Sequence, residues 1–267
     1  MSAFEEGYAF FTKQAGVQIA GFEGGIYVGQ VDNEIEKLIH DLNAFEGFKT
    51  KPDMLKGDIA EFWHSDTFNV NAVARGTASR TFVDRSHDFA SADISSNFGK
   101  IFGLKYYKDG VESAKQQAKS VFERFHEYRA SGGKDSLEMF LEKRGFTDDA
   151  VLHDPIYYGQ IRVIPKDQLE TACEWLRRKI ATESVIRPEQ VERYKETLAR
   201  LSDRLSDDLG TESVPLSEAD AKALAALAKE GDVTAEELKQ LGISADEVIR
   251  FEYLAKEAFK SGLTAAT

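Results

Sequence analysis

The chain has 267 residues, of which 42% are hydrophobic and 30% charged, and its formal net charge is −12. This length provides for one large domain or two modest ones, each with its own core. The acidic balance argues against a protein that coats nucleic acid through bulk electrostatics, although a local basic groove can lie on an acidic body. Between Arg75 and Lys119, eight lysines and arginines outnumber five acidic residues, so this region runs against the trend.

The cellular compartment is predicted from two features. No apolar run is long enough to cross a bilayer, and the N-terminus, MSAFEEGYAFF, lacks the basic start of a signal peptide. Cys173 is the single cysteine, so no internal disulfide can form, and we expect a buried structural thiol. The sequence therefore predicts a cytoplasmic protein without a membrane segment.

The first third of the chain predicts two amphipathic helices. Upstream of them, GGIYVGQ predicts a short strand. Residues 33–46 have apolar side chains at helical spacing, with Asn33 as the N-cap and Glu36 in the capping-box position. The second helix begins near Pro52, and its apolar stripe consists of Leu55, Ile59, Phe62 and Trp63.

A β region follows the loop RGTASR. It begins with the strand TFVDR and continues into a hairpin whose turn, NFGK, places Gly99 where a positive φ is needed. We then expect one long amphipathic helix over about 111–130 and a short helix that ends at Gly145. The segment YYGQIRVIPKDQ predicts a strand that stops at Pro165, with Asp167 capping a helix over 168–183.

The composition changes after residue 185. Both charge signs are densely mixed, and three helix starts carry capping pairs, namely Ser217 with Asp220, Thr234 with Glu237, and Ser244 with Glu247. No strand signal occurs there. The sequence therefore predicts a mixed α/β domain over 1–185, then an all-α region over 186–267 whose charged helices are a candidate surface for a protein partner. The helical pattern continues to the last residues, so we expect a piece of a longer protein.

The hairpin SADISSNFGKIFGLKYYKDG places Asp93 on one strand and Lys105 on the other. Side chains alternate along a strand, so Gly103, Lys105 and Tyr107 share one face. A lysine among aromatic residues needs either an exit to water or a charged partner. Asp93 and Lys105 can pair with each other, can lie at exposed strand ends, or can belong to a metal-dependent active site.

An acid on a helix, an aspartate on a strand and a lysine on the adjacent strand, in this order, resemble the PD-(D/E)XK (restriction-endonuclease-like) nuclease superfamily. The matching residues are Glu61 in IAEFWH, Asp93 in SADIS and Lys105 in GLKYYK. The resemblance covers residues 52–180. It implies a mixed central sheet flanked by helices and Mg²⁺- or Mn²⁺-dependent hydrolysis of phosphodiester bonds in nucleic acid, in a mobile-element, toxin or defence context.

The resemblance also implies the role of each residue. Asp93 is the main metal ligand, Glu61 a second carboxylate, and Lys105 the cation that orients water or stabilises the transition state. The sequence departs from the family at Gly103, where a Glu or Gln is expected two positions before the lysine. The site then lacks an acid unless Glu61 or Asp109 replaces it. The alternative is an inactive scaffold that binds nucleic acid or a protein.

His64 is a further candidate, since it lies three residues after Glu61 on the same helical face. It can assist the metal-binding carboxylate as a catalytic residue, or it can be a surface histidine near a helix end. A zinc site formed with His87 is a weaker alternative, because no Cys/His pair in the chain has the spacing of a structural zinc site.

Overall fold

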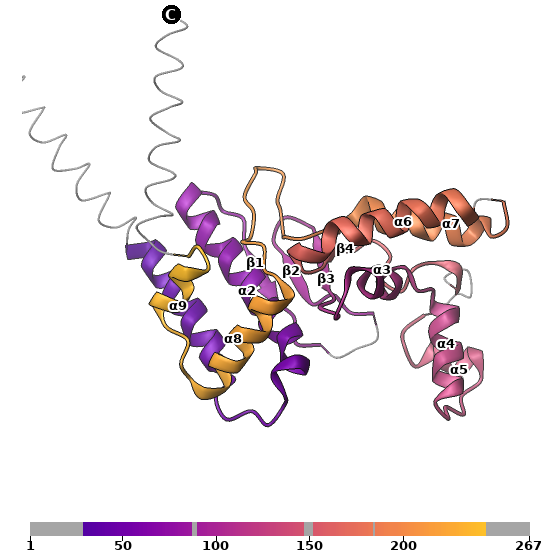
Figure 1. Ribbon diagram of the computed structural model, residues 1–267, viewed down its shortest axis with the longest axis horizontal. Coiled ribbons are helices and arrows are strands. Elements are labelled where there is room, and N and C mark those ends of the chain that lie inside the picture. Colours follow the sequence, from indigo (N-terminus) through magenta and orange to yellow (C-terminus); the bar gives the residue numbers. More distant parts are fainter. Residues whose placement is uncertain (1–28, 87–89, 147–151, 184, 244–267) are drawn as a thin grey trace, which may run out of the picture.

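The computed structural model describes residues 29–86, 90–146, 152–183 and 185–243. At its centre lies a five-stranded mixed sheet (Figure 1). The strands follow the chain in the order β1 (Thr81–Val83), β2 (Ile94–Ser96), β3 (Ile101–Leu104), β4 (Ile161–Val163) and β5 (Leu201–Ser202). The first three pair antiparallel, and β4 and β5 add parallel. The prediction of a mixed α/β protein is confirmed.

The hairpin between β2 and β3 has the predicted turn. Gly99 adopts a φ of 79°, in the left-handed region that favours glycine. The Ser96 hydroxyl donates to the Lys100 carbonyl at 2.6 Å and accepts from the Lys100 backbone N–H at 3.0 Å. These bonds fix the register, in which Ile94 lies opposite Phe102.

One face of the sheet is covered by α2 (Pro52–Arg75), which packs against α8 (Glu218–Glu230). A proline in its first turn starts α2, and Gly76, with a φ of 68°, ends it. A helix over 29–43 and α9 (Ala235–Gln240) complete this side (Figure 1). The main hydrophobic core lies here, and its largest members from α2 and the sheet are Leu55, Ile59, Trp63, Phe68, Ile94, Phe102 and Val163.

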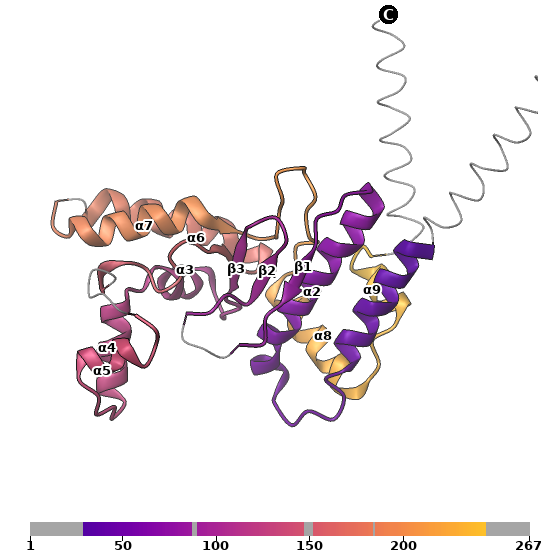
Figure 2. The same cartoon turned by 180° about the vertical axis from the view of Figure 1, so that it is seen from behind.

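The helices α3 (Gly110–Ala118), α6 (Leu169–Glu183) and α7 (Pro188–Arg200) enclose a second core around Ile164 and Trp175. Seen from both sides, α4 (Val121–Ala130) and α5 (Leu137–Glu142) form a lobe that extends away from the sheet (Figures 1 and 2). Its small core is built around Phe140 and Leu141.

Three helix starts differ from the prediction. The first helix already includes residue 29, so Asn33 lies inside it and is no cap. The helix expected over 111–130 is interrupted, because Ser120 forms a complete capping box with Glu123 and starts α4. Asp167 lies in a 3₁₀ turn (Lys166–Gln168), and its Oδ1 accepts from the Glu218 backbone N–H at 3.0 Å.

The region after residue 185 also differs from the expected all-α unit. It contributes β5 to the sheet and α8 to the main core, and residue 185 falls between α6 and α7, which pack together. The caps at Ser217 and Thr234 are present. Ser244 and most of GGIYVGQ lie outside the described residues, and residues 29 and 30 are helical. Cys173 is half-buried, and burial raises the pKa of its thiol.

Candidate functional site

Asp93 and Lys105 lie at the same end of the hairpin, since β2 begins one residue after Asp93 and β3 ends one residue before Lys105. Asp93 Oδ2 accepts from the Leu104 backbone N–H at 2.6 Å and lies 3.3 Å from Lys105 Nζ. Among the described residues, no hydrogen bond reaches the other oxygen, Oδ1. The bonds to Oδ2 therefore fix the orientation of the carboxylate, and Oδ1 remains available to a ligand.

Lys105 is held in place on three sides. Its Nζ donates to the Leu104 carbonyl at 2.8 Å, pairs with Asp93 and lies 4.9 Å from the centre of the Tyr157 ring. Burial by itself lowers the pKa of Lys105, but Tyr157 and Asp93 outweigh it and the net pKa is raised. The ammonium group thus stays charged at neutral pH in a position that is only 20% exposed.

Glu61 comes from α2, and the charges of both Asp93 and Lys105 act on its carboxyl group. The side chain is half-buried and has no hydrogen bond or ion pair with any described residue. Burial, together with Asp93 and Asp58, raises the pKa of Glu61 to about 8, against the opposing effect of Lys105. Glu61 is thus an unpartnered carboxyl group on which the charges of the hairpin pair act.

Gly103 has a neighbour that the sequence did not indicate. A Cβ atom built on Gly103 would lie 2.5 Å from Oε1 of Gln160, the residue immediately before β4. Gln160 is 4% exposed, and its Nε2 donates to the Ala90 carbonyl at 2.8 Å. The space above Gly103 is therefore occupied by an amide group from the residue that precedes the next strand.

Gln160 and Tyr157 are the site residues that sequence reasoning missed. Both lie in the segment YYGQIRV, which was interpreted only as the start of a strand. The parallel pairing of β3 with β4, in which Phe102 lies opposite Ile161, brings this segment beside the hairpin. No spacing rule connects residues more than fifty positions apart, so the sequence offered no signal for either residue.

His64 is fully buried, contrary to the interpretation as a surface histidine. Its Nδ1 lies 2.8 Å from Ser213 Oγ and its Nε2 lies 2.8 Å from the Tyr106 hydroxyl. The Ser213 hydroxyl accepts from the Leu205 N–H, and the Tyr106 hydroxyl donates to the Leu216 carbonyl at 3.2 Å. These bonds assign the proton to Nε2, which donates to Tyr106, while Nδ1 accepts from Ser213.

This geometry gives His64 a structural role. Burial lowers its pKa to about 3, so the ring is neutral, and both nitrogens are already bonded. The His64 ring is held by Tyr106 and Ser213 and forms no hydrogen bond with Asp93 or Lys105. Zinc ligation by this ring would break one of its two hydrogen bonds, and the proposed partner, His87, lies outside the described residues.

Asp109, the other acid considered as a replacement at Gly103, caps a helix. Its Oδ1 accepts from the Glu112 backbone N–H at 2.8 Å and starts α3. The capping bond alone explains why an aspartate occurs at this position, so no role in a metal site is needed to explain it.

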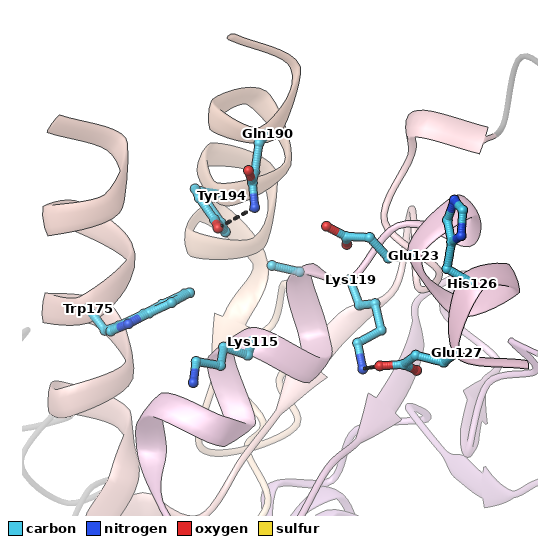
Figure 3. Close-up of a pocket in the computed structure, with 9 residues that line it drawn as sticks. Lys115, Lys119, Glu123, His126, Glu127, Trp175, Gln190 and Tyr194 are labelled. Atoms are coloured by element: carbon cyan, nitrogen blue, oxygen red, sulfur yellow. Dashed lines mark hydrogen bonds and ion pairs between the residues drawn. The ribbon is translucent and has the colours of Figure 1, made fainter. Parts of the chain in front are cut away.

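The described residues form several surface cavities, one of which, of about 630 Å³, is lined by Tyr106 and Tyr107 after β3. Two others lie beside the helices that flank the sheet. One, of about 550 Å³, adjoins the candidate site because Tyr157 and Ala90 line it together with Arg124 and Tyr128. The other, of about 380 Å³, is enclosed by side chains from α3, α4, α6 and α7 (Figure 3). It shares no lining residue with the site. Its charges are mixed, and the lining residues include Lys115, Lys119, Glu123, Glu127, Trp175 and Tyr194.

The donor set around Asp93 fits a hard cation only in part. Within the described ranges, no group of three or more His, Cys, Asp or Glu side chains is arranged to hold a metal ion. The two carboxyl groups of Glu61 and Asp93 and the amide oxygen of Gln160 are oxygen donors of the type that Mg²⁺ and Mn²⁺ accept, with water completing the shell.

The comparisons with known proteins identify no relative. No family model matches the chain, no curated protein is similar to it, and no solved structure matches it. None of the described helices is long and apolar enough to cross a membrane.

Proposed function

We propose that the chain is a metal-dependent nuclease with a restriction-endonuclease-like fold, which hydrolyses phosphodiester bonds of nucleic acid. The supporting observation is the Asp93–Lys105 pair at one end of the hairpin, whose charges act on an unpartnered, half-buried carboxyl group of α2, that of Glu61. Carboxyl groups without partners in sparsely hydrated places are costly and gather at functional sites. A cytoplasmic location and a mobile-element, toxin or defence context belong to the same proposal.

Asp93 and Glu61 would hold Mg²⁺ or Mn²⁺. Bound there, the ion would neutralise charge that develops on the phosphate and lower the pKa of a water ligand. Asp93 is suited to this role because Leu104 N–H fixes Oδ2 and leaves Oδ1 without a hydrogen bond from the described residues. Preorganised ligands of this kind bind a cation without first paying for reorientation.

Lys105 supplies the positive charge. The Leu104 carbonyl and Asp93 Oδ2 accept two of the three ammonium protons, so the third can donate to a phosphate oxygen of the substrate. The neighbouring cavity contributes the guanidinium group of Arg124 and the ring of Tyr128. A cation and an aromatic face are groups that bind the backbone and bases of nucleic acid.

Gly103 and the closed Asp93–Lys105 pair favour a second candidate, a scaffold that binds nucleic acid or a protein partner without cleaving it. A carboxylate that is already neutralised by an ammonium group attracts a cation less strongly. The charged helices after residue 185 would then be the surface for a protein partner.

Cleavage of DNA and RNA with Mg²⁺ or Mn²⁺ tests the proposal. We expect wild type to cleave at least one of them, and Asp93→Ala and Lys105→Ala to lose at least 100-fold in rate, because each removes charge from the reacting centre. Lys100→Ala is the matched control, since Lys100 lies at the other end of the same strand and pairs with the exposed Asp208. Cleavage that persists in both site variants would refute the assignment, and a wild type without cleavage but with binding would establish the scaffold.

A further inference from the structure

The cavity of about 380 Å³ between α3, α4, α6 and α7 lies apart from the Asp93–Lys105 pair. Its size is within the range of about 300–1,000 Å³ that is usual for small-molecule sites. Figure 3 shows Lys115 of α3 and Trp175 of α6 extending into the space between these helices, with Tyr194 of α7 beside them. The proposed function uses none of these three side chains, so the cavity is a candidate site of a different kind.

Trp175 and Tyr194 form an aromatic wall on one side of this cavity. The centres of their rings lie 5.5 Å apart, and the ring planes meet at 80°. The two side chains are 7% and 6% exposed and belong to the second core, so packing fixes their orientation. An edge-to-face pair of this kind offers apolar surface to another ring. The wall therefore favours a ligand with a planar apolar part.

The two carboxylates that line the cavity already have cationic partners. Glu123 Oε1 lies 3.3 Å from Arg193 Nη2, and Oε2 accepts a backbone N–H in the capping box of α4. Glu127 pairs through one oxygen with Lys119 and through the other with Arg124. Because these partners neutralise both carboxylates, the cavity attracts a cationic ligand only weakly.

The hydrogen-bond donors of the cavity, by contrast, are not all used. Lys115 Nζ has no hydrogen bond or ion pair with any described residue. The Tyr194 oxygen accepts from Gln190 Nε2 at 2.7 Å, so the hydroxyl proton has no acceptor within the described ranges. Burial raises the pKa of Tyr194 to about 12, so the hydroxyl keeps this proton at neutral pH. The indole Nε1 of Trp175 also lacks a partner among the described residues and is not enclosed by protein.

The local charge has the sign that suits these donors. Lys179 lies over the Trp175 ring but pairs with Glu183, so the two charges cancel. The remaining cations that line or border the cavity are four against two carboxylates, which leaves a local charge of +2; they are Lys115, Lys119, Arg124 and Arg193. The whole chain has a net charge of −12. A positive place on an acidic protein concentrates small anions there.

We propose that this cavity binds a small planar organic anion, whose acidic group pairs with Lys115 and whose ring packs against Trp175 and Tyr194. The inference goes beyond the proposed function and does not depend on it, since neither the hairpin pair nor a metal ion takes part. The acidic group is a carboxylate or a phosphate, because both accept charge-assisted hydrogen bonds from an ammonium group.

Four probes separate the contribution of the ring from that of the charge. Benzoate and phenyl phosphate carry both, benzyl alcohol carries a ring alone, and inorganic phosphate carries the charge alone. Calorimetry on the full chain without divalent metal should show that benzoate or phenyl phosphate binds about tenfold or more tightly than either single-feature probe. The tighter of the two acids identifies the acidic group.

Tryptophan fluorescence reports where the probe binds. The chain has two tryptophans, and Trp63 is fully buried with its Nε1 bonded to the Val214 carbonyl at 2.7 Å. Binding in the cavity should therefore change the emission of Trp175 alone. We expect Trp175→Phe to remove the fluorescence response, while thermal unfolding shows whether this variant folds.

Lys115→Gln tests the charge without disturbing the core, because the side chain is exposed. We expect it to weaken binding of the tighter acid about tenfold and to flatten the dependence of affinity on salt. Lys239→Gln is the matched control, since Lys239 is an exposed lysine on α9. It should leave both quantities unchanged.

Three results would overturn the inference. They are the absence of binding by both acids, binding of inorganic phosphate as tight as that of phenyl phosphate, and equal affinity in Lys115→Gln and Lys239→Gln. The measurements contain neither metal nor nucleic acid, so a wild type that cleaves no nucleic acid would refute the proposed function and leave this inference standing.

Discussion

Glu61 and His64 lie three residues apart on α2, yet their side chains meet opposite conditions. The imidazole of His64 is fully buried and both nitrogens are bonded to hydroxyl groups that are themselves bonded further on. The carboxyl group of Glu61 is half-buried beside Asp93 and has no partner among the described residues. Burial is common to both. The two side chains differ in whether their polar atoms have hydrogen-bond partners. A buried polar group with partners stabilises the fold, whereas one without partners is available for chemistry.

The largest effect that tests this comparison is the loss of folding stability caused by His64 at acidic pH. Its pKa is about 3 in the folded chain and 6.5 without burial. Its contribution to stability is therefore complete above pH 6.5 and is lost as the pH falls toward 3, by on the order of 4 kcal/mol. Urea unfolding of wild type and His64→Leu between pH 3.5 and 7 should show a flatter dependence in the variant. The exposed His40, changed to Asn, is the control and should keep the wild-type dependence.

Glu61 should have the opposite effect: it should lower the free energy of unfolding as the pH rises, not as it falls. Because its pKa rises from 4.5 to about 8 on folding, its stabilising effect is complete below pH 4.5 and is lost as the pH rises through 8. Without metal, Glu61→Gln should exceed wild type in unfolding free energy by about 2 kcal/mol at pH 9 and match it at pH 4. This is less than half of what the full pKa shift implies, because water screens the partly exposed carboxyl group. Glu174→Gln, on the exposed side of α6, should change neither value. A wild type as stable as the variant at pH 9 would mean that Glu61 has a partner.

The smallest effect concerns Asp109, which is an acid near the hairpin but a satisfied one. Asp109→Ala should cost about 1 kcal/mol of stability by removing the cap of α3, whereas Asp109→Asn should cost almost nothing. Neither variant should change Mn²⁺ affinity. A loss of affinity in Asp109→Asn with unchanged stability would place this residue in the site after all, and calorimetry beside urea unfolding measures both quantities.

The sequence predicted the elements that local rules determine. The turn at Gly99, the start of α2 at Pro52 and the caps at Ser217 and Thr234 follow from a few adjacent residues each. The placement of Asp93 and Lys105 at one end of the hairpin follows from strand alternation across a tight turn. The break between α3 and α4 could also have been predicted, because Ser120 and Glu123 form an ordinary capping box.

The rest depends on partners that are far apart in the chain. The environment of His64 is set by Ser213, and that of Gly103 by Gln160, through packing that no local pattern encodes. The strand β5 has two residues, too few for a periodic signal, and exists because β4 offers it an edge. The all-α expectation for the region after residue 185 was wrong for this reason.

The packing of α8 on α2 has a consequence for how the chain is made. Helix α2 is complete at Arg75, but the part of its apolar face that packs against α8 stays uncovered until α8, which ends at Glu230, has emerged from the ribosome. At synthesis rates of about 5–20 residues per second, the 155 residues between these two points take roughly 8 to 30 seconds. We therefore expect the part of the main core between α2 and α8 to form well after α2 and the hairpin have been made.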